Sequence, residues 1–312
     1  MTGSSHDPAD RTVRAVAAAA EAGRERGLAV TEPVVLYDVF SVVVHLAPSP
    51  VVVRVPTVLP VGSTLETQAA GQREEIAVVE WLAAQGCPVV VPSPLVAAEP
   101  VERDGFSMTF WQWADHRPPA EPDWTADTAP VADLHLAMRD YAGPLRFLPF
   151  LSDVPAAFGM LATRPDLIEA ADLDRAQREW EVLAPVVTTS DGLLAEFGEA
   201  EIQPVHGDSP TYNLIKTPEG PLYSDFELAC LGPIEWDLTL LEPAAVAAYT
   251  ERAGRLGLRA PDERLLRVME ATRMLQVVAV LSMVPQLPMM AEALKVPLGH
   301  WRSRPFAGGL GS

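Results

Sequence analysis

Strand-like segments are concentrated in the first third of the chain, and this segregation constrains the fold more than any other feature. Three Val-rich segments, VVLYDV, FSVVVHLA and SPVVVRVPT, follow one another between residues 34 and 57 and are divided by Pro and Ser. Consecutive short segments rich in β-branched residues are typical of antiparallel strands joined by tight turns. We therefore expect a β-meander, preceded by an Ala-rich amphipathic helix over residues 10–26 that ends at Gly27.

The segments that follow the meander complete a first lobe. Residues 66–84 place apolar side chains on one stripe and are closed by Gly86, which predicts an amphipathic helix. Two further strands are expected at 87–91 and 106–112. The run DHRPPAEPDW, which starts at Asp115, is rich in proline and charge and predicts a linker or lobe boundary.

Most of the remaining sequence has helical periodicity. Apolar residues recur at three- or four-residue spacing in four segments, at 128–141, 172–187, 236–252 and 261–283. A small β-insert interrupts them, with expected strands at 202–205, 213–215 and 222–224. Strands followed by helices indicate an α+β fold. We expect a small antiparallel N-terminal lobe over residues 1–113 and a mainly helical C-terminal lobe over residues 114–312.

Composition disfavours several functional classes. The 312 residues include 42 acidic and 23 basic side chains, and the formal charge of −19 disfavours nucleic acid and suits a cationic partner, although an acidic surface equally serves solubility. Cys87 and Cys230 lack the spacing of a disulfide framework or a zinc site, which fits a reducing compartment. The most apolar stretch, 275–290, is interrupted by Gln and Pro before it could span a bilayer. We expect a cytoplasmic monomer or homodimer that does not insert into membranes.

The segment VHGDSPTYNLIK at 205–216 interrupts apolar sequence with polar and turn residues. Phosphoryl transfer from a nucleotide needs a carboxylate to accept the proton of the acceptor hydroxyl and oxygen ligands that hold Mg²⁺ against the phosphates. Asp208, Asn213 and Asp225 supply such groups in this order, and the turn at 218–220 is expected to return Asp225 to the other two. This combination indicates a phosphotransferase site.

The run HGDSPTYNLIKTPEGPLYSDFELACLGPIEWDL resembles the catalytic core of the aminoglycoside phosphotransferase and choline kinase-like family, relatives of the protein kinases. The match is dense over residues 203–241 and coarser elsewhere. The resemblance implies a two-lobed protein kinase-like fold. It also implies that Asp208 is the catalytic base and that Asn213 and Asp225 are the Mg²⁺ ligands.

Several neighbouring residues are assigned supporting roles. The resemblance implies that His206 braces the loop rather than acting chemically, and that Asp237 fixes the loop from the next helix. His135 is expected to be a packed or capping residue. Glu235 and Glu242 could line an acceptor pocket, although a solvated helix position is the commoner fate of such residues.

In the first lobe, Arg54 lies on a strand where the family carries a basic residue against the nucleotide phosphates. The resemblance makes Glu75 on the following helix its ion-pair partner. Glu74 is the alternative partner, but the helical spacing favours Glu75. An arginine on a strand more commonly faces solvent or a surface carboxylate, and this second interpretation of Arg54 stays open.

The nucleotide-binding segments have one family-like and one unusual feature. Phe110, Trp111, Gln112 and Trp113 correspond to the hinge whose backbone contacts adenine, although alternation on a half-buried strand also explains the tryptophans. The turn that covers the phosphates in kinases is rich in glycine, whereas residues 37–41, YDVFS, contain none. Nucleotide binding through this turn is therefore an open question.

These features predict a small-molecule kinase that uses ATP or GTP with Mg²⁺. The acceptor class implied by the resemblance is an aminoglycoside, an amino-sugar or another aminoalcohol, and the biological role could be antibiotic resistance, self-protection or metabolism. Two alternatives remain: a ligand-binding protein of kinase fold without productive ATP use, favoured by the glycine-free turn and Arg54, and a transferase that uses another phosphorylated donor.

Overall fold

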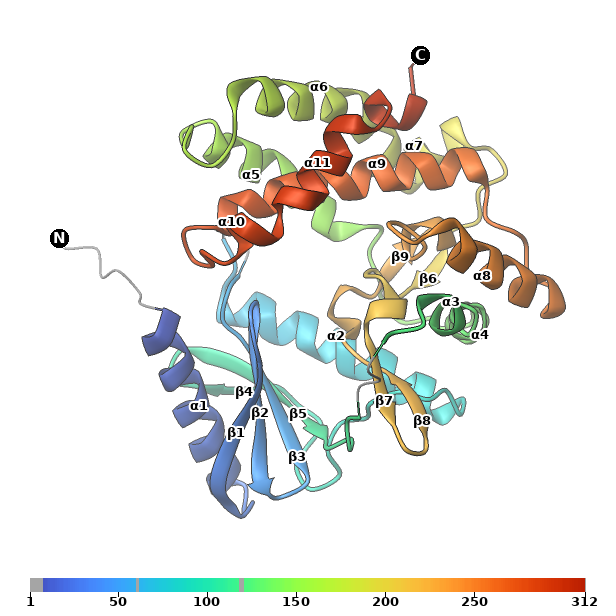
Figure 1. Cartoon of the computed structure of the whole chain (residues 1–312). Coiled ribbons are helices and arrows are strands. Elements are labelled where there is room, and N and C mark those ends of the chain that lie inside the picture. The colour runs from blue at the N-terminus through green and yellow to red at the C-terminus, as the bar shows by residue number, and fades with distance from the viewer. Residues whose placement is uncertain (1–7, 60–61, 118–120, 312) are drawn as a thin grey trace. The chain divides into compact units, whose positions relative to one another are not determined.

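The computed structural model of the chain describes residues 8–59, 62–117 and 121–311 (Figure 1). It forms two compact units. The N-terminal unit comprises Met1–Arg117 with Ile215–Leu222, and the C-terminal unit comprises Pro118–Leu214 with Tyr223–Ser312. The predicted linker at 115–124 includes residues 118–120, which lie outside the described part of the chain. We retain a lobe boundary near residue 113 as a proposal.

The N-terminal unit is built on a five-stranded antiparallel sheet with the strand order β1-β2-β3-β5-β4. The strands are β1 (Val30–Asp38), β2 (Ser41–Pro48), β3 (Val51–Pro56), β4 (Val101–Arg103) and β5 (Phe106–Gln112). The predicted meander is confirmed, but the strand predicted at 87–91 is wrong. That segment makes only scattered backbone contacts, among them the Gln112 N–H donating to the Val91 carbonyl at 2.9 Å and a bridge between Pro92 and Trp111.

The two predicted helices of this unit are confirmed as α1 (Pro8–Glu25) and α2 (Leu65–Ala84). Helix α2 starts with Thr64, whose hydroxyl accepts from the Thr67 N–H while the Thr67 hydroxyl accepts from the Thr64 N–H. This reciprocal cap satisfies two of the backbone donors that a helix start leaves without partners. Gly27 and Gly86 follow the two helices with φ of 81° and 78°, the left-handed conformation that stops a helix.

Strand alternation assigns the two helices to opposite faces of the sheet. Val53 on β3 and Phe110 on β5 share one buried cluster with the alanines of α1. Successive side chains of a strand point to opposite faces, so Arg54 and Ser107 lie on the other face. There they bond to side chains of α2, and this arrangement explains why a strand arginine is buried rather than solvated.

The C-terminal unit is mainly helical (Figure 1). Its α-helices are α3 (Trp124–Thr128), α4 (Val131–Met138), α5 (Val154–Leu161), α6 (Ala170–Val187), α7 (Ser190–Glu196), α8 (Pro243–Arg255), α9 (Glu263–Val280), α10 (Met290–Ala293) and α11 (Lys295–Ser303). Short 3₁₀ turns are η1 (Pro149–Asp153), η2 (Pro210–Tyr212), η3 (Phe226–Leu228), η4 (Ile234–Trp236), η5 (Leu281–Met283) and η6 (Phe306–Gly309). The helix predicted at 128–141 is found as α4 over Val131–Met138, with Thr128 belonging to the end of α3. The helix predicted from residue 236 begins at Pro243, a residue suited to a first helical turn.

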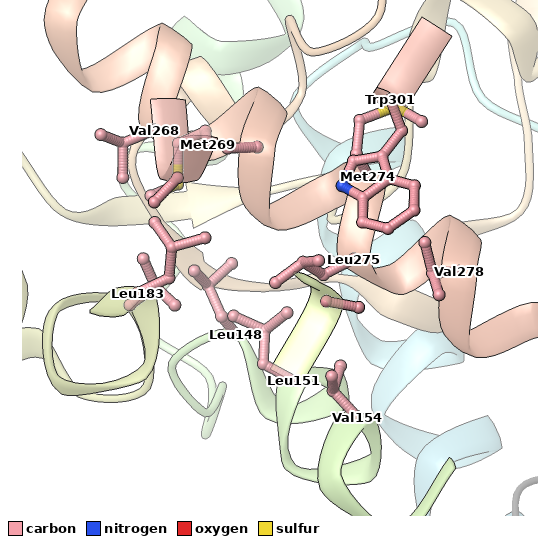
Figure 2. Close-up of a cluster of buried hydrophobic side chains, with 14 of the residues drawn as sticks. Leu148, Leu151, Val154, Leu183, Val268, Met269, Met274, Leu275, Val278 and Trp301 are labelled. Atoms are coloured by element: carbon pink, nitrogen blue, oxygen red, sulfur yellow. The ribbon is translucent and has the colours of Figure 1, made fainter. Parts of the chain in front are cut away.

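Helix α9 is the centre of the core of the C-terminal unit. Figure 2 shows Met274, Leu275 and Val278 of α9 among apolar side chains of other elements, including Leu151 and Val154. Burial of these side chains fixes the rotation of α9 about its axis, because a different rotation would bring polar residues into the cluster. None of the helices in the described part of the chain combines the length and apolar character needed to cross a bilayer.

The predicted single β-insert is two separate pairs of strands. Strand β6 (Gln203–Val205) pairs antiparallel with β9 (Cys230–Gly232), whereas β7 (Leu214–Thr217) pairs with β8 (Gly220–Tyr223). Most of the β7–β8 hairpin belongs to the N-terminal unit, where the Arg117 N–H donates to the Lys216 carbonyl at 2.8 Å. The prediction was wrong because it joined neighbouring strands in sequence, and β6 takes its partner from beyond the hairpin.

Candidate active site

The loop that carries the HGD sequence is anchored by one buried carboxylate. Asp237 follows η4 and is fully buried. Its Oδ2 accepts from the His206 N–H at 2.8 Å, and its Oδ1 accepts from the Gly207 N–H at 2.9 Å. The same Oδ2 contacts His135 Nε2 at 3.0 Å, and His135 Nδ1 contacts the Tyr249 hydroxyl at 2.8 Å. The carboxylate oxygen can only accept, so Nε2 carries a proton, and the ring is a buried link between Asp237 and Tyr249.

Gly207 allows the loop to pass close to the DFE segment. Its φ is 85°, and an added Cβ would lie 1.7 Å from the Leu228 carbonyl oxygen. Any other residue would collide with the backbone there. The Gly207 carbonyl accepts from the Trp236 indole N–H at 2.6 Å, which fixes the peptide plane that precedes Asp208.

His206 connects the same two segments through its side chain. Nε2 lies 3.0 Å from the Ser224 carbonyl, which can only accept, so Nε2 carries the proton. The ring packs against Phe226 with centroids 4.5 Å apart, and the residue is fully buried. These contacts suit a bracing role better than a chemical one.

Asp208 and Asn213 are joined directly. The Asn213 Nδ2 donates to Asp208 Oδ2 at 3.1 Å and to the Ser209 carbonyl at 3.2 Å. The amide oxygen, Oδ1, takes no part in these two bonds and is the acceptor end of the side chain. The Asn213 carbonyl accepts from both the N–H and the hydroxyl of Ser224, at 2.9 and 3.0 Å. The structure thereby ties Asn213 to the residue before Asp225, whose φ of 65° turns the chain sharply.

Arg273 on α9 also faces Asp208, and the sequence interpretation did not include it. Its Nη1 lies 3.7 Å from Asp208 Oδ1, and its guanidinium stacks on the Trp236 ring at 4.0 Å. The sequence did contain an indication of this role, because Arg273 falls on the helical stripe that also carries the apolar Leu265 and Met269. A charge on an apolar stripe requires a buried partner.

The ionisation of Asp208 reflects competing effects. Burial alone would raise the pKa of Asp208, but the charge of Arg273, assisted by His206 and by the hydrogen bonds from Asn213 and Ser209, outweighs it and holds the pKa below its ordinary value. The side chain is 44% exposed. Asp208 is therefore a solvent-accessible carboxylate that stays ionised to lower pH than an ordinary aspartate.

In the N-terminal unit, Arg54 and Glu75 form a buried ion pair between β3 and α2. Glu74 is only partly buried, so the structure selects Glu75 of the two candidates. Arg54 does not face solvent, and the solvent-facing interpretation is wrong. The sheet thus holds a buried cation, Arg54, and α2 supplies the predicted carboxylate partner, Glu75.

The segment predicted as the hinge is already engaged in the sheet of the N-terminal unit. The Phe110 carbonyl accepts from the Ser93 N–H at 3.0 Å, and the Trp113 N–H donates to the Pro50 carbonyl at 3.0 Å. Trp111 donates its indole N–H to the Thr109 hydroxyl at 2.8 Å. The Gln112 N–H donates to the Val91 carbonyl, so these backbone groups already have hydrogen-bond partners within the protein. Hydrogen bonds from this segment to adenine would have to come from its other atoms.

The glycine-free turn between β1 and β2 is fixed by side chains of α1. Arg11 donates to Asp38 Oδ1 at 2.6 Å, and the Thr12 hydroxyl donates to Asp38 Oδ2 at 2.5 Å. On the other side, the Phe40 carbonyl accepts from the N–H groups of Thr57 and Val58, at 3.0 and 2.9 Å. Hydrogen bonds hold the conformation of this turn where kinases rely on the freedom of glycine.

The two glutamates considered for an acceptor pocket have different environments. Glu235 is fully buried, and its oxygens accept from the Arg259 guanidinium at 2.5 and 2.9 Å and from the Asp262 N–H at 2.7 Å. Glu235 is therefore a structural residue, and its assignment to an acceptor pocket is wrong. Glu242 is exposed at the start of α8 and stays a candidate.

An exposed aromatic pair lies next to the HGD loop. Tyr212 is 48% exposed and contacts Trp124, 41% exposed, with ring centroids 4.8 Å apart in an edge arrangement. Burial of part of the ring and the charge of Glu242 raise the pKa of Tyr212. Within residues 8–59, 62–117 and 121–311, no three or more His, Cys, Asp or Glu side chains are grouped so that these residue types alone could hold a metal ion.

Comparisons with known proteins agree with this geometry. The model of the phosphotransferase enzyme family matches residues 42–275. No curated protein sequence matches the chain. Among solved structures, the chain is similar to amicoumacin kinase hAmiN in complex with AMP-PNP, Ca²⁺ and Ami, with 11% identity over 90% of this chain and 93% of that one, at a TM-score of 0.60.

Two further solved structures are comparably similar. A microcompartment-associated aminopropanol kinase is 16% identical over 90% of this chain and 94% of its own, at a TM-score of 0.59. A choline/ethanolamine kinase family protein from Mesorhizobium loti is 15% identical over 96% of this chain and 98% of its own, at a TM-score of 0.57. At these identities the likeness establishes the fold, which is protein kinase-like.

Proposed function

Because the chain belongs to the phosphotransferase enzyme family, we propose that it transfers the γ-phosphoryl group of ATP or GTP to a hydroxyl of a small amino-containing molecule. Its class, a phosphotransferase with an alcohol group as acceptor, follows from the family. The observation that carries the finer proposal is the network in which Asn213 bonds to Asp208 and to Ser224. This network joins the proposed base to the segment that contains Asp225.

Asp208 is the proposed base. Its exposed carboxylate can be reached by an acceptor hydroxyl, and its lowered pKa keeps it ionised at neutral pH. As the acceptor oxygen bonds to the γ-phosphorus, the hydroxyl proton passes to Asp208 and the bond from that phosphorus to the bridging oxygen breaks. The products are a phosphate ester and a nucleoside diphosphate.

Asn213 and Asp225 are the proposed ligands of Mg²⁺. Both nitrogen-bound hydrogens of the Asn213 amide have acceptors in the loop, so its oxygen is the end available to a cation. Proteins commonly bind Mg²⁺ through one or two such oxygen ligands together with substrate phosphates, and this pair fits that pattern. The bound ion would neutralise charge on the phosphates during transfer.

Arg54 is the proposed phosphate-binding residue of the N-terminal unit, positioned by Glu75. Replacing Arg54 with Met is expected to weaken nucleotide binding about 10- to 100-fold, since a hydrogen bond to a charged group contributes roughly 1.5–3 kcal/mol. Calorimetric titration measures this change. Arg73→Met is the matched control, because Arg73 lies on the exposed face of α2 and its ion-pair partner is the exposed Glu99. Equal nucleotide affinity of the Arg54 variant and the wild type would contradict the assignment.

The acceptor proposed is a cationic aminoalcohol, amino-sugar or aminoglycoside. Tyr212 follows Asp208 by four residues and, with Trp124, presents exposed aromatic surface beside the Glu242 carboxylate. An ammonium group is attracted both by aromatic faces and by a carboxylate. This combination supports an acceptor that carries an amine near its reacting hydroxyl.

Isothermal titration with ATP and with GTP, each with and without Mg²⁺, tests the proposal first. We expect binding that requires the metal and that is strongly weakened in Asp225→Asn, because this change removes a proposed carboxylate ligand of the ion. An acceptor screen read by product mass then identifies the phosphorylated compound and its donor. A second candidate function, ligand binding without productive ATP use, is favoured by the glycine-free turn at 37–41, and a folded protein that binds neither nucleotide would support it.

A further inference from the structure

Arg273 is held where a charged side chain is costly. It lies in the middle of α9, next to Met274, whose side chain belongs to the core shown in Figure 2. The residue is 7% exposed. Burial lowers the pKa of Arg273, while the carboxylates of Asp208 and Asp237 oppose that effect. A buried guanidinium persists only where other groups compensate for its lost hydration.

Most of the compensating groups belong to the HGD loop and the segment that anchors it, and Gln276 of α9 adds one more, since its Oε1 accepts from Arg273 Nη1 at 3.2 Å. Arg273 Nε donates to the Thr239 hydroxyl at 3.2 Å, and Nη2 lies 3.4 Å from the Gly207 carbonyl and 3.5 Å from the Trp236 carbonyl. Its planar group lies over the Trp236 ring. These contacts fix the position of the guanidinium independently of its interaction with Asp208.

The two oxygens of Asp208 have different neighbours. Nη1 of Arg273 is 3.7 Å from Oδ1, whereas the Asn213 amide donates to Oδ2. One side of the carboxylate is held from α9 and the other from its own loop. The remaining lone pairs are the ones that an acceptor hydroxyl can reach, so the direction of proton transfer is defined by both neighbours.

We propose that Arg273 is a positioning residue for the reaction: its fixed guanidinium, with Nη1 3.7 Å from Oδ1, orients the carboxylate of Asp208 that accepts the proton. The inference rests on the proposed function, in which Asp208 is the base. It adds a residue outside the HGD…N…DFE motif, supplied by a helix more than sixty positions later in the chain.

The test compares Arg273→Met, which keeps the length of the side chain and removes its charge, with Arg273→Lys, which restores the charge without the planar group. For the Met variant we expect kcat to fall roughly 10- to 100-fold, while nucleotide affinity stays within about twofold of wild type. The Lys variant should recover part of kcat, because it restores the charge but not the planar group.

The matched control is Arg175→Met. Arg175 also lies on a helix of the C-terminal unit and also stacks on a tryptophan, Trp301, at 4.9 Å, but it bonds to Glu179 and not to Asp208. This control should lower thermal stability without changing kcat per folded molecule. An Arg273→Met enzyme with near wild-type kcat per folded molecule would overturn the proposal.

A second measurement does not need activity, so it separates this inference from the proposed function. Unfolding of the wild type, Asp208→Asn, Arg273→Met and the double variant forms a cycle whose coupling reports the interaction of the two residues. Coupling between the two positions at neutral pH supports the proposal. Absence of coupling at neutral pH overturns it, whereas a wild type without any phosphoryl transfer would count against the proposed function alone.

Discussion

Replacing Asp208 with Asn is expected to reduce the rate of phosphoryl transfer by about 10²- to 10⁴-fold while leaving the protein folded. The amide cannot accept the proton of the acceptor hydroxyl at neutral pH. It keeps the size of the side chain, and one oxygen can still accept from Asn213. Measured kcat with the acceptor found by product mass, together with the thermal unfolding temperature, checks both parts of the expectation.

The protein should stay folded because Asp208 takes little part in the packing of the loop. Its side chain is 44% exposed, whereas the carboxylate that binds the loop backbone is that of Asp237. Asp174→Asn serves as the control, because Asp174 is an exposed residue of α6 whose partner is Arg178. If Asp208→Asn retained more than a tenth of wild-type kcat, Asp208 would not be the base.

The pH dependence of the wild type follows from the same carboxylate. The pKa of Asp208 is lowered in the folded protein, so the charged form contributes stability above the ordinary pKa of an aspartate, and this contribution is lost as the pH falls through the folded value. Activity should persist over the same range, because the base stays ionised. Its exposure means that solvent screens much of the effect on stability.

Local patterns predicted the sheet of the N-terminal unit well. The β1–β2–β3 meander joins strands that are neighbours in sequence, so short turns and Val-rich segments are sufficient to define it. The same reasoning failed for β6, whose partner β9 lies beyond an intervening hairpin. Non-local pairing depends on how the helices around it pack, and no short segment contains that information.

The site divides in the same way. Asp208, Asn213 and Asp225 fall within eighteen positions of one another, so their spacing carries the chemistry. The core contacts of α9 fix its rotation so that the guanidinium of Arg273 points towards Trp236. Arg273 reaches the loop only because of this rotation. The sequence indicates a buried partner for Arg273, because it places a charge on an apolar stripe. It does not identify the group that Arg273 contacts.

The hinge shows a different limit. Phe110, Trp111, Gln112 and Trp113 were assigned by position relative to a family motif, and the structure places the first three inside β5. Which backbone groups remain available depends on partners such as Ser93 and Pro50. A linear motif locates such a segment but does not record hydrogen bonds that the segment has already formed.

Asp237→Ala is expected to lower the free energy of unfolding by about 3–5 kcal/mol, because it removes one member of a buried, hydrogen-bonded charge network. The N–H groups of His206 and Gly207 and the Nε2–H of His135 would lose their acceptor inside the protein. For a unit of this size the loss corresponds to roughly 6–20 °C in the unfolding temperature. Chemical denaturation and calorimetry measure the two quantities.

Asp237→Asn and Asp262→Asn show whether the charge or the hydrogen bonds carry this stability. An amide at position 237 keeps one acceptor but turns an NH₂ group towards other donors, so it should also destabilise, by less than Ala. Asp262 caps α9 through the Leu265 N–H, and Asn caps a helix about as well, so this control should change stability by only a few tenths of a kcal/mol. A cost below about 1 kcal/mol for Asp237→Ala would mean that the loop conformation is set by Gly207 and Trp236 instead, and the anchoring role assigned to this carboxylate would be wrong.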